Sequence, residues 1–349
     1  MSSLKPGSRV LVTGVTGYIG THVADQLLKA GYVVIGTSRT ASKAETVKKY
    51  FDATYGPGKF EIYEAGDLQQ AGVFDDAVKD VEAIAHVASP VIFSAKDPFA
   101  DVINPAVKGT LSLLNSAHKY GKHVKHVVVT SSVASIMDPN KPSDYVYSEA
   151  DWNDEAIKTI QRQVERGDTF EGPIAYRASK NEAERAIWKF RDENQPSFTL
   201  ATILPSFVFG AILPPPTTTQ AVDATSTPKA LINYYTGESQ DPTFSTGSSS
   251  FVNVVDVAVA HVLALQNAQK TNGQRYITSQ GAFTNQEVVD ILRREYPDRQ
   301  NIIAKGEPGK YKRPTVTVDG SKVTRELGLQ YTDFETVVLQ TIECVKHLY

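Results

Sequence analysis

Tyr176 and Lys180 are the two side chains whose types and spacing point most directly to chemistry. They lie in the segment Tyr-Arg-Ala-Ser-Lys, and a spacing of four residues places the phenol and the ammonium on one face of a helix. The spacing alone is weak evidence, because a chain with 16 tyrosines is expected to contain it about once by chance. Residues 130–132, Thr-Ser-Ser, strengthen it, since they end a predicted strand and would face the same cleft.

A glycine-rich turn near the amino terminus is the second motif. The strand predicted over residues 9–13 runs directly into Thr-Gly-Val-Thr-Gly-Tyr-Ile-Gly, which ends at residue 20, and then into a helix. The three glycines tighten the turn, let backbone amides approach a pyrophosphate and pack the helix against the strand. The helix N-terminus favours the diphosphate, because it offers unpaired N–H groups and a positive dipole end. The predicted dinucleotide contacts are Gly14, Thr16, Gly17, Tyr18, Ile19 and Gly20.

The end of the second predicted strand, residues 32–37, distinguishes NAD from NADP. Enzymes that use NAD usually place Asp or Glu there to accept a hydrogen bond from the ribose 2′-hydroxyl, but residues 36–43 read Gly-Thr-Ser-Arg-Thr-Ala-Ser-Lys. Arg39 can stack on the adenine and bind a 2′-phosphate, and Lys43 adds a second positive charge. The alternative is that both are solvated surface cations. Together with the glycine turn, they predict NADPH as the cofactor.

Asp67 and Leu68 follow the third predicted strand, residues 59–63, and both are predicted to contact the cofactor. The carboxylate of Asp67 can accept a hydrogen bond from the adenine amino group. It can also cap the next helix, and the two roles are compatible.

The elements that must position these residues alternate along the first half of the chain. Short apolar runs alternate with longer amphipathic segments, which is typical of βαβ units and a parallel sheet. Strands are predicted over residues 9–13, 32–37, 59–63, 83–87, 126–130 and 199–204, and helices over 19–30, 104–119 and 175–191. The predicted fold class is α/β, a doubly wound parallel (Rossmann) sheet with a smaller C-terminal substrate-binding region.

The sequence changes character after Pro205. Residues 214–227 are rich in Pro, Thr and Ser and indicate a long flexible loop. Residues 251–256 indicate a return to the sheet, with helices over 257–268, 285–294 and 333–347. We therefore assign residues 1–205, with about 250–280, to an NADP-binding domain. The substrate-binding region then comprises about 206–249 and 281–349.

Composition excludes several classes of function. With 36 basic and 39 acidic residues the net charge is −3, so the chain lacks the basic surface that nucleic-acid binding requires. The single cysteine, Cys344, favours a reducing compartment, and no apolar run reaches the roughly 20 residues of a membrane span. We expect a cytoplasmic protein without a membrane partner, and its oligomeric state stays open. His118, His123 and His126 match no zinc spacing, so no metal is expected.

Taken in order, the glycine turn, the Thr-Ser-Ser segment and Tyr-x-x-x-Lys resemble an extended short-chain dehydrogenase/reductase. Residues 86–90 (His-Val-Ala-Ser-Pro), 176–180, 186–188 (Ala-Ile-Trp) and 204–210 (Leu-Pro-Ser-Phe-Val-Phe-Gly) are similar to the dihydroflavonol-reductase-like group. Within that group the chain most resembles the fungal NADPH-dependent methylglyoxal, aldehyde and ketone reductases. The resemblance covers essentially the whole chain.

The resemblance implies a role for each matching residue. Ser132 matches the catalytic serine of the family, Tyr176 the general acid and Lys180 its partner, and the last two also contact the cofactor. The other cofactor contacts that it implies are Val87, Ala88, Ser89, Thr130, Pro205, Phe207 and Val208. Ala106 is a departure, because it stands where extended members often carry an Asn that relays protons.

These side chains suggest a mechanism. Ser132 and Tyr176 would donate hydrogen bonds to a substrate carbonyl, where negative charge develops. Lys180 would hold the nicotinamide ribose and lower the phenol pKa from about 10 toward the working pH. Hydride would pass from the nicotinamide to the carbonyl carbon while Tyr176 supplies the proton. Phe93 and Phe207 are candidates for an apolar substrate wall, or are ordinary core residues.

We therefore expect an NADPH-dependent carbonyl reductase. It would convert an aldehyde, ketone, diketone or keto ester, a small molecule, to a chiral alcohol. One alternative is an NAD-dependent nucleotide-sugar epimerase or dehydratase on the same fold. The other is a non-enzymatic, dinucleotide-sensing regulator that keeps the fold without the chemistry.

Overall fold

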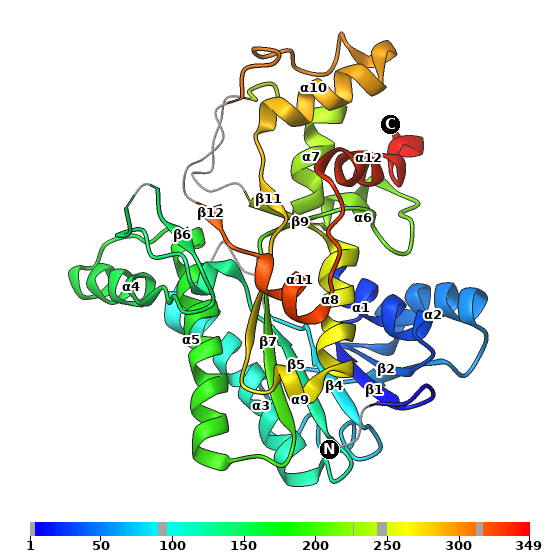
Figure 1. Ribbon diagram of the computed structural model, residues 1–349, viewed down its shortest axis with the longest axis vertical. Coiled ribbons are helices and arrows are strands. Elements are labelled where there is room, and N and C mark those ends of the chain that lie inside the picture. Colours follow the sequence, from blue (N-terminus) through cyan, green and yellow to red (C-terminus); the bar gives the residue numbers. More distant parts are fainter. Residues whose placement is uncertain (1–3, 90–95, 143, 226, 243–249, 312–316) are drawn as a thin grey trace.

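A seven-stranded parallel sheet forms the centre of the molecule (Figure 1). The computed structural model describes residues 4–89, 96–142, 144–225, 227–242, 250–311 and 317–349. Across the sheet the strands follow the order β10-β7-β5-β4-β1-β2-β3. They are β1 (Arg9–Thr13), β2 (Val33–Ser38), β3 (Phe60–Glu64), β4 (Ala83–His86), β5 (His126–Thr130), β7 (Thr199–Pro205) and β10 (Arg275–Thr278). The order reverses between β1 and β4, and a ligand crevice is expected there, beyond the carboxyl ends of the strands.

Helices cover both faces of this sheet, which explains why its strands are so apolar. On one face α1 (Tyr18–Lys29) and α8 (Val254–Gln266) pack against side chains that include Val10 and Val12. On the other face α3 (Asn104–Tyr120) and α5 (Gly172–Asn194) pack against a set that includes Leu11. Successive residues of β1 therefore point into two separate cores, as the two-residue period of a strand requires. The predicted doubly wound fold is confirmed.

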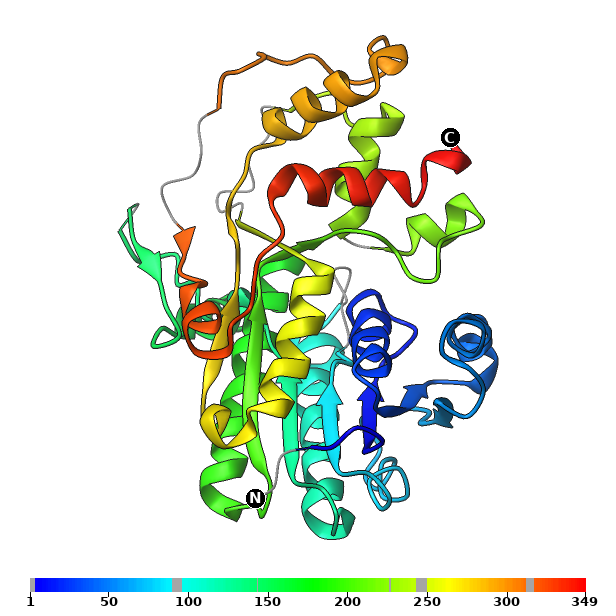
Figure 2. The same ribbon diagram turned by 45° about the vertical axis from the view of Figure 1, so that its right-hand side comes forward.

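A smaller lobe lies beyond the carboxyl ends of the central strands (Figure 2). Its three-stranded sheet has the order β11-β9-β8, formed by β8 (Phe207–Phe209), β9 (Ser250–Asn253) and β11 (Gly281–Ala282). Its helices are α6 (Thr219–Asp223), α7 (Thr227–Thr236), α10 (Asn285–Glu295) and α12 (Phe334–Glu343). A separate hydrophobic core holds the lobe together and includes Leu231, Phe251 and Val338.

Residues 210–212 link the lobe to the first helix of the central domain. The Tyr18 hydroxyl donates a hydrogen bond to the carbonyl oxygen of Gly210 at 2.9 Å, and His22 Nε2 donates to that of Ala211 at 2.9 Å. On the lobe side, the Gly210 N–H donates to Thr341 Oγ1 at 2.9 Å. The segment is therefore bound to α1 on one side and to α12 on the other.

The remaining elements are short or lie at the edges. They comprise the helices α2 (Ala41–Tyr55), α4 (Asp154–Arg166), α9 (Ala268–Thr271) and α11 (Ser321–Leu327), and the paired strands β6 (Val146–Tyr147) and β12 (Thr317–Val318). One π-turn, Phe99–Ile103, precedes α3, and 3₁₀ turns occupy Val133–Ser135, Pro297–Arg299 and Lys346–Leu348.

Two predictions about the second half of the chain are wrong. Residues 251–256 do not return to the central sheet, because the Asn253 side chain accepts a hydrogen bond from the Val255 N–H at 2.8 Å and begins α8 there. The preceding strand belongs to the small sheet, and β10 is the seventh central strand. Residues 214–227 are not an unstructured loop throughout, since Thr218 caps α6 by accepting from the Ala221 N–H.

Candidate active site

The glycine turn joins β1 to α1 and leaves little room for a side chain at Gly14 and none at Gly20. Gly14 has φ +72°, and a Cβ there would lie 3.1 Å from the Cα of Ala88. A Cβ on Gly20 would lie only 2.2 Å from the carbonyl oxygen of Gly14. The first turn of α1 carries no acidic residue, so its positive end is open to an anion. The turn thus provides a close-fitting backbone cradle of the kind that receives a pyrophosphate.

Thr13 fastens this turn to the end of β4. Its hydroxyl oxygen accepts hydrogen bonds from the N–H groups of Val87 and Ala88, both at 3.0 Å, and its proton is donated to His86 Nδ1 at 2.8 Å. Burial, and then the charge of Lys180, lower the pKa of His86 to about 3, so the imidazole is neutral at physiological pH. Val87 and Ala88, two of the three residues predicted to pass under the cofactor, are therefore fixed against the turn.

The predicted adenosine end of the site lies at the carboxyl ends of β2 and β3. Arg39 and Lys43 are exposed and flank Thr40, the N-cap of α2, whose first turn has no acidic residue. In place of an acid, Thr37 accepts a hydrogen bond from the Gly14 N–H at 3.2 Å. The helix predicted after Asp67 is absent, and the chain forms a turn there. The Asp67 Oδ1 accepts a hydrogen bond from the Gln69 N–H at 3.0 Å within this turn.

Ser132, Tyr176 and Lys180 meet at the carboxyl end of β5. Ser132 caps the 3₁₀ turn that follows β5, and its Oγ accepts from the Ala134 N–H at 3.1 Å. Its hydroxyl also forms a hydrogen bond with the phenol of Tyr176. The Nζ of Lys180 lies 5.8 Å from the centre of the Tyr176 ring, one turn farther along α5. The structure thus brings together the three side chains that the sequence grouped.

The protonation states at this site differ from the prediction. Burial raises the pKa of Tyr176, and the hydrogen bond from Ser132 opposes that rise. Burial lowers the pKa of Lys180 to about 8, while the charge of Glu184 acts in the opposite direction. The expected lowering of the phenol pKa by Lys180 is therefore wrong for this structure, because desolvation dominates. At neutral pH the phenol retains its proton, which is the form that a general acid requires.

A narrow cavity lies next to Lys180. Its lining comes from β4, β5, α3 and α5 and comprises His86, Ala88, Ser89, Thr110, Val129, Thr130, Ser131, Lys180, Ala183, Glu184 and Ile187. The hydroxyl of Thr130 donates to His261 Nε2 at 2.7 Å, because His261 Nδ1 already donates to the Val257 carbonyl. Thr130 therefore ties β5 to α8 from the edge of this cavity.

The predicted nicotinamide and substrate residues lie at the start of the small lobe. Pro205 ends β7, and Val208 is buried in β8. Phe207 is 38% exposed and stacks on Phe209 with 6.4 Å between the ring centroids, so it is not a core residue. Phe93 lies outside the described residues.

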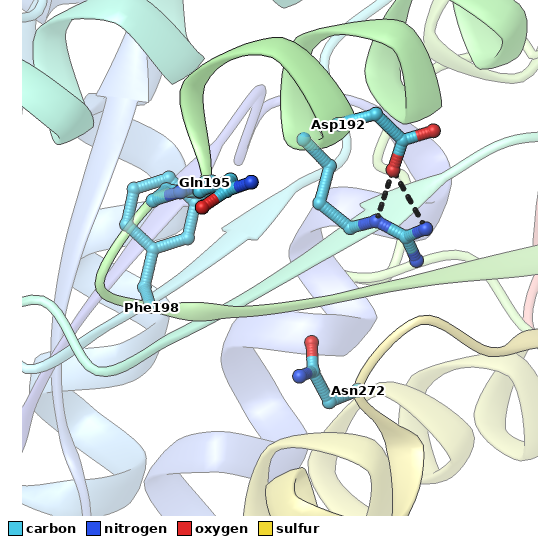
Figure 3. Close-up of a pocket in the computed structure, with 6 residues that line it drawn as sticks. Asp192, Gln195, Phe198 and Asn272 are labelled. Carbon is cyan, nitrogen blue, oxygen red and sulfur yellow. Dashed lines mark hydrogen bonds and ion pairs between the residues drawn. The ribbon is translucent and has the colours of Figure 1, made fainter.

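A second, open hollow lies at the C-terminal end of α5 (Figure 3). It is lined by Arg191, Asp192, Gln195, Pro196, Phe198 and Asn272, close to the start of β7. The Arg191 guanidinium is already paired with Asp192 at 2.8 Å. No predicted site residue lies there, and Tyr176 lies near the other end of α5.

Sequence reasoning missed a buried ion pair behind the site. Glu184 lies one turn beyond Lys180 on α5, and its Oε1 accepts from Arg275 Nε at 2.8 Å. Although burial raises its pKa, the charge and hydrogen bonds of Arg275 hold the pKa of Glu184 below its ordinary value. The four-residue step from Lys180 to Glu184 was the available signal, because it places both on one helix face.

Comparison with known proteins identifies the class. Residues 10–277 match the family described as the NAD dependent epimerase/dehydratase family, and the chain belongs to it. It is an extended short-chain dehydrogenase/reductase, as the motifs predicted.

Individual relatives are more specific. The chain is 37% identical to aldehyde reductase 2 of Sporidiobolus salmonicolor, over 85% of this chain and 83% of that protein. It is 32% identical to the NADPH-dependent methylglyoxal reductase of Saccharomyces cerevisiae, over 95% and 96% of the two chains. The crystal structure of Gre2 from Candida albicans in complex with NADPH matches with a TM-score of 0.85 and 31% identity, covering 98% of this chain and 99% of that one. The predicted resemblance to fungal NADPH-dependent reductases is confirmed.

Proposed function

We propose that this protein is an NADPH-dependent carbonyl reductase in which Tyr176 is the general acid, Ser132 its partner at the substrate oxygen and Lys180 the cation beside them. The observation that carries the proposal is the protonated phenol of Tyr176, hydrogen-bonded to Ser132 at the carboxyl edge of a Rossmann sheet. The relatives above include proteins named aldehyde and methylglyoxal reductases. Small aldehydes and ketones are therefore the substrate class.

The cofactor site fits NADPH on the geometry of this chain. The pyrophosphate would lie on the Gly14–Gly20 backbone, where a Cβ on Gly14 would press on Ala88 and one on Gly20 would collide with the turn. The 2′-phosphate would face Arg39 and Lys43, since no carboxylate ends β2. When bound, NADPH supplies the hydride.

The side chains of the protein bind and polarise the carbonyl group and supply the proton. Ser132 and Tyr176 hold the carbonyl oxygen and polarise it, and the phenol transfers its proton to that oxygen as negative charge develops. Lys180 stabilises the phenolate that results, because its ammonium lies on the same helix face. Phe207 offers an exposed aromatic wall from the small lobe, and we assign substrate selection to that lobe.

We also retain two coarser expectations as proposals. The NADP-binding unit comprises residues 1–205 with about 250–280, although β9 at the start of the second segment pairs within the small sheet, and the remainder is the substrate-binding region. The single cysteine favours the cytoplasm. Within the described ranges, no helix is both long and apolar enough to cross a bilayer.

The Tyr176→Phe variant tests the function. It keeps the ring and loses the proton, so NADPH binding should persist while turnover of aldehydes and ketones falls at least about 100-fold. Fluorescence titration gives the Kd for NADPH, and NADPH oxidation at 340 nm gives kcat. A Tyr55→Phe variant, whose hydroxyl donates to Asp25 between α2 and α1, is the matched control. Normal turnover by Tyr176→Phe would refute the assigned acid, and a wild-type protein that binds NADPH without turnover would favour the regulator.

A further inference from the structure

We propose that Glu184 is a positioning residue of the active site, which holds the Ser132 turn in place and offsets the charge of Lys180. The inference rests on the proposed function and adds to it a residue that does not touch the substrate. It starts from a carboxylate that is completely buried, yet is surrounded by donors that belong to the site.

Glu184 accepts hydrogen bonds from four side chains, which lie just after β5, in the 3₁₀ turn, in β7 and in β10. Its Oε2 accepts from the hydroxyls of Ser131 and Ser135, both at 2.6 Å. Its Oε1 accepts from Thr202 of β7 at 2.9 Å, and Arg275 of β10 donates to both oxygens. Hydrogen bonds to an ionised acceptor are short and strong, so this carboxylate fixes its neighbours more firmly than a neutral group would.

The two serines bracket Ser132. Ser131 precedes it, and Ser135 closes the 3₁₀ turn by donating from its N–H to the Ser132 carbonyl at 3.0 Å. Asn181 of α5 adds a bond from Nδ2 to the Ser135 carbonyl at 3.1 Å. Both ends of the turn are therefore hydrogen-bonded to side chains of α5. Because Tyr176 also lies on α5, the Ser132 hydroxyl is held at a fixed distance from the Tyr176 phenol.

Arg275 anchors the network from the other side. Its Nη1 donates to the carbonyl oxygens of Glu149 and Asp151 at 2.6 and 2.7 Å, and its guanidinium lies 3.8 Å from the ring centre of Trp152. Its position is thus set by the chain that leads into α4. Glu184 is consequently held between a fixed cation and the Ser132 turn.

Glu184 also acts on Lys180 through its charge. The ionisable groups that face Lys180 are His86 of β4 and Tyr176 and Glu184 of α5, while Arg275 of β10 lies behind Glu184. The cavity lining from α3 and β5 consists of Thr110, Val129, Thr130 and Ser131, which carry no charge. Glu184 is therefore the anion that keeps Lys180 protonated to higher pH.

A purely structural ion pair would behave differently. Replacing both members of a buried ion pair by neutral groups often leaves stability unchanged. Removing only one member destabilises the fold, because the other charge stays buried without a partner. We therefore compare Glu184→Gln with the double variant Glu184→Gln/Arg275→Met, which leaves no unpaired charge. If Glu184→Gln fails to fold, the double variant still gives the answer. Glu184→Asp, which keeps the charge, tests rescue.

The readouts are chosen to separate positioning from folding. Tm reports folding, titration gives the Kd for NADPH, and kcat is measured against pH with protiated and 4-deuterated NADPH. In the folded double variant we expect an unchanged Kd for NADPH, a kcat about 10- to 100-fold lower, and a basic limb of the pH profile moved to lower pH, because Lys180 loses its proton sooner. Glu184→Asp should recover part of kcat and of the basic limb.

Glu182→Gln is the control on the same helix. Glu182 is half-buried, two residues away and faces Asp154 and Arg185 rather than Lys180, so its kcat and pH profile should match the wild type. A double variant that folds, binds NADPH and keeps kcat within about twofold, with the basic limb in place, would overturn the inference. Absence of turnover in the wild type would instead count against the proposed function.

Discussion

Gly20→Ala tests whether the glycine turn is a cofactor cradle. The added Cβ would lie 2.2 Å from the Gly14 carbonyl oxygen and 2.8 Å from its carbon, whereas ordinary contacts begin near 3.4 Å. The turn and α1 must therefore separate by about 1 Å, at a cost of roughly 1–3 kcal/mol in unfolding free energy. Losing one charge-assisted hydrogen bond to the pyrophosphate costs about 1.5–3 kcal/mol, so the Kd for NADPH should rise about 10- to 100-fold.

Gly109→Ala is the matched control. Gly109 lies inside α3, and a Cβ there would meet Leu68 at 3.7 Å, an ordinary contact. That variant should bind NADPH like the wild type and be slightly more stable, since alanine favours helix by about 1 kcal/mol. Isothermal titration gives the Kd, and urea unfolding gives the stability. If Gly20→Ala matched Gly109→Ala in both measurements, the cradle would be refuted.

Two further predictions concern charge. Arg39→Ala should raise the Kd for NADPH about tenfold or more and that for NADH by much less, because NADH shares only the adenine contact and lacks the 2′-phosphate. Lys49→Ala on α2 is the control, and equal losses for both cofactors would contradict the assignment. Burial lowers the pKa of His86 to about 3 and that of His261 to about 4, so both stay neutral in the fold. Unfolding then takes up protons below about pH 6.5, and the unfolding free energy should fall as pH drops from 7 to 5. His261→Gln should show a smaller fall in urea titrations, and an identical slope would speak against the buried imidazole.

Six of the seven central strands were predictable because they are largely apolar runs, whereas β10 was not predicted. Residues 9–13 and 126–130 match β1 and β5 as predicted. The strand at 251–256 was misplaced because apolar periodicity gives the type of an element and not its partner. β9 pairs with β8 and β11, and only the fold brings those strands together.

Within the site, the sequence predicted the types of the catalytic residues and their order along the chain, but not the direction of their pKa shifts. Tyr176 and Lys180 were identifiable from their spacing, yet the balance between burial and charge depends on neighbours from β4, β5 and β10. Arg275 is 95 positions from Lys180 in the numbering and reaches the site only because β10 lies next to β7. A partner so far away in the sequence produces no local spacing from which the ion pair could be predicted.

The link between α1 and residues 210–212 bears on how such a reductase can be modified. Tyr18, in the turn that would cradle the pyrophosphate, is bonded to the segment that leads into the small lobe. The glycine turn and α1 are therefore hydrogen-bonded to the first residues of the lobe, while α7 and α10 lie at the outer end of the lobe (Figure 1). Substitutions in the outer part of the lobe can thus change the substrate range while the position of the nicotinamide end of the cofactor is kept.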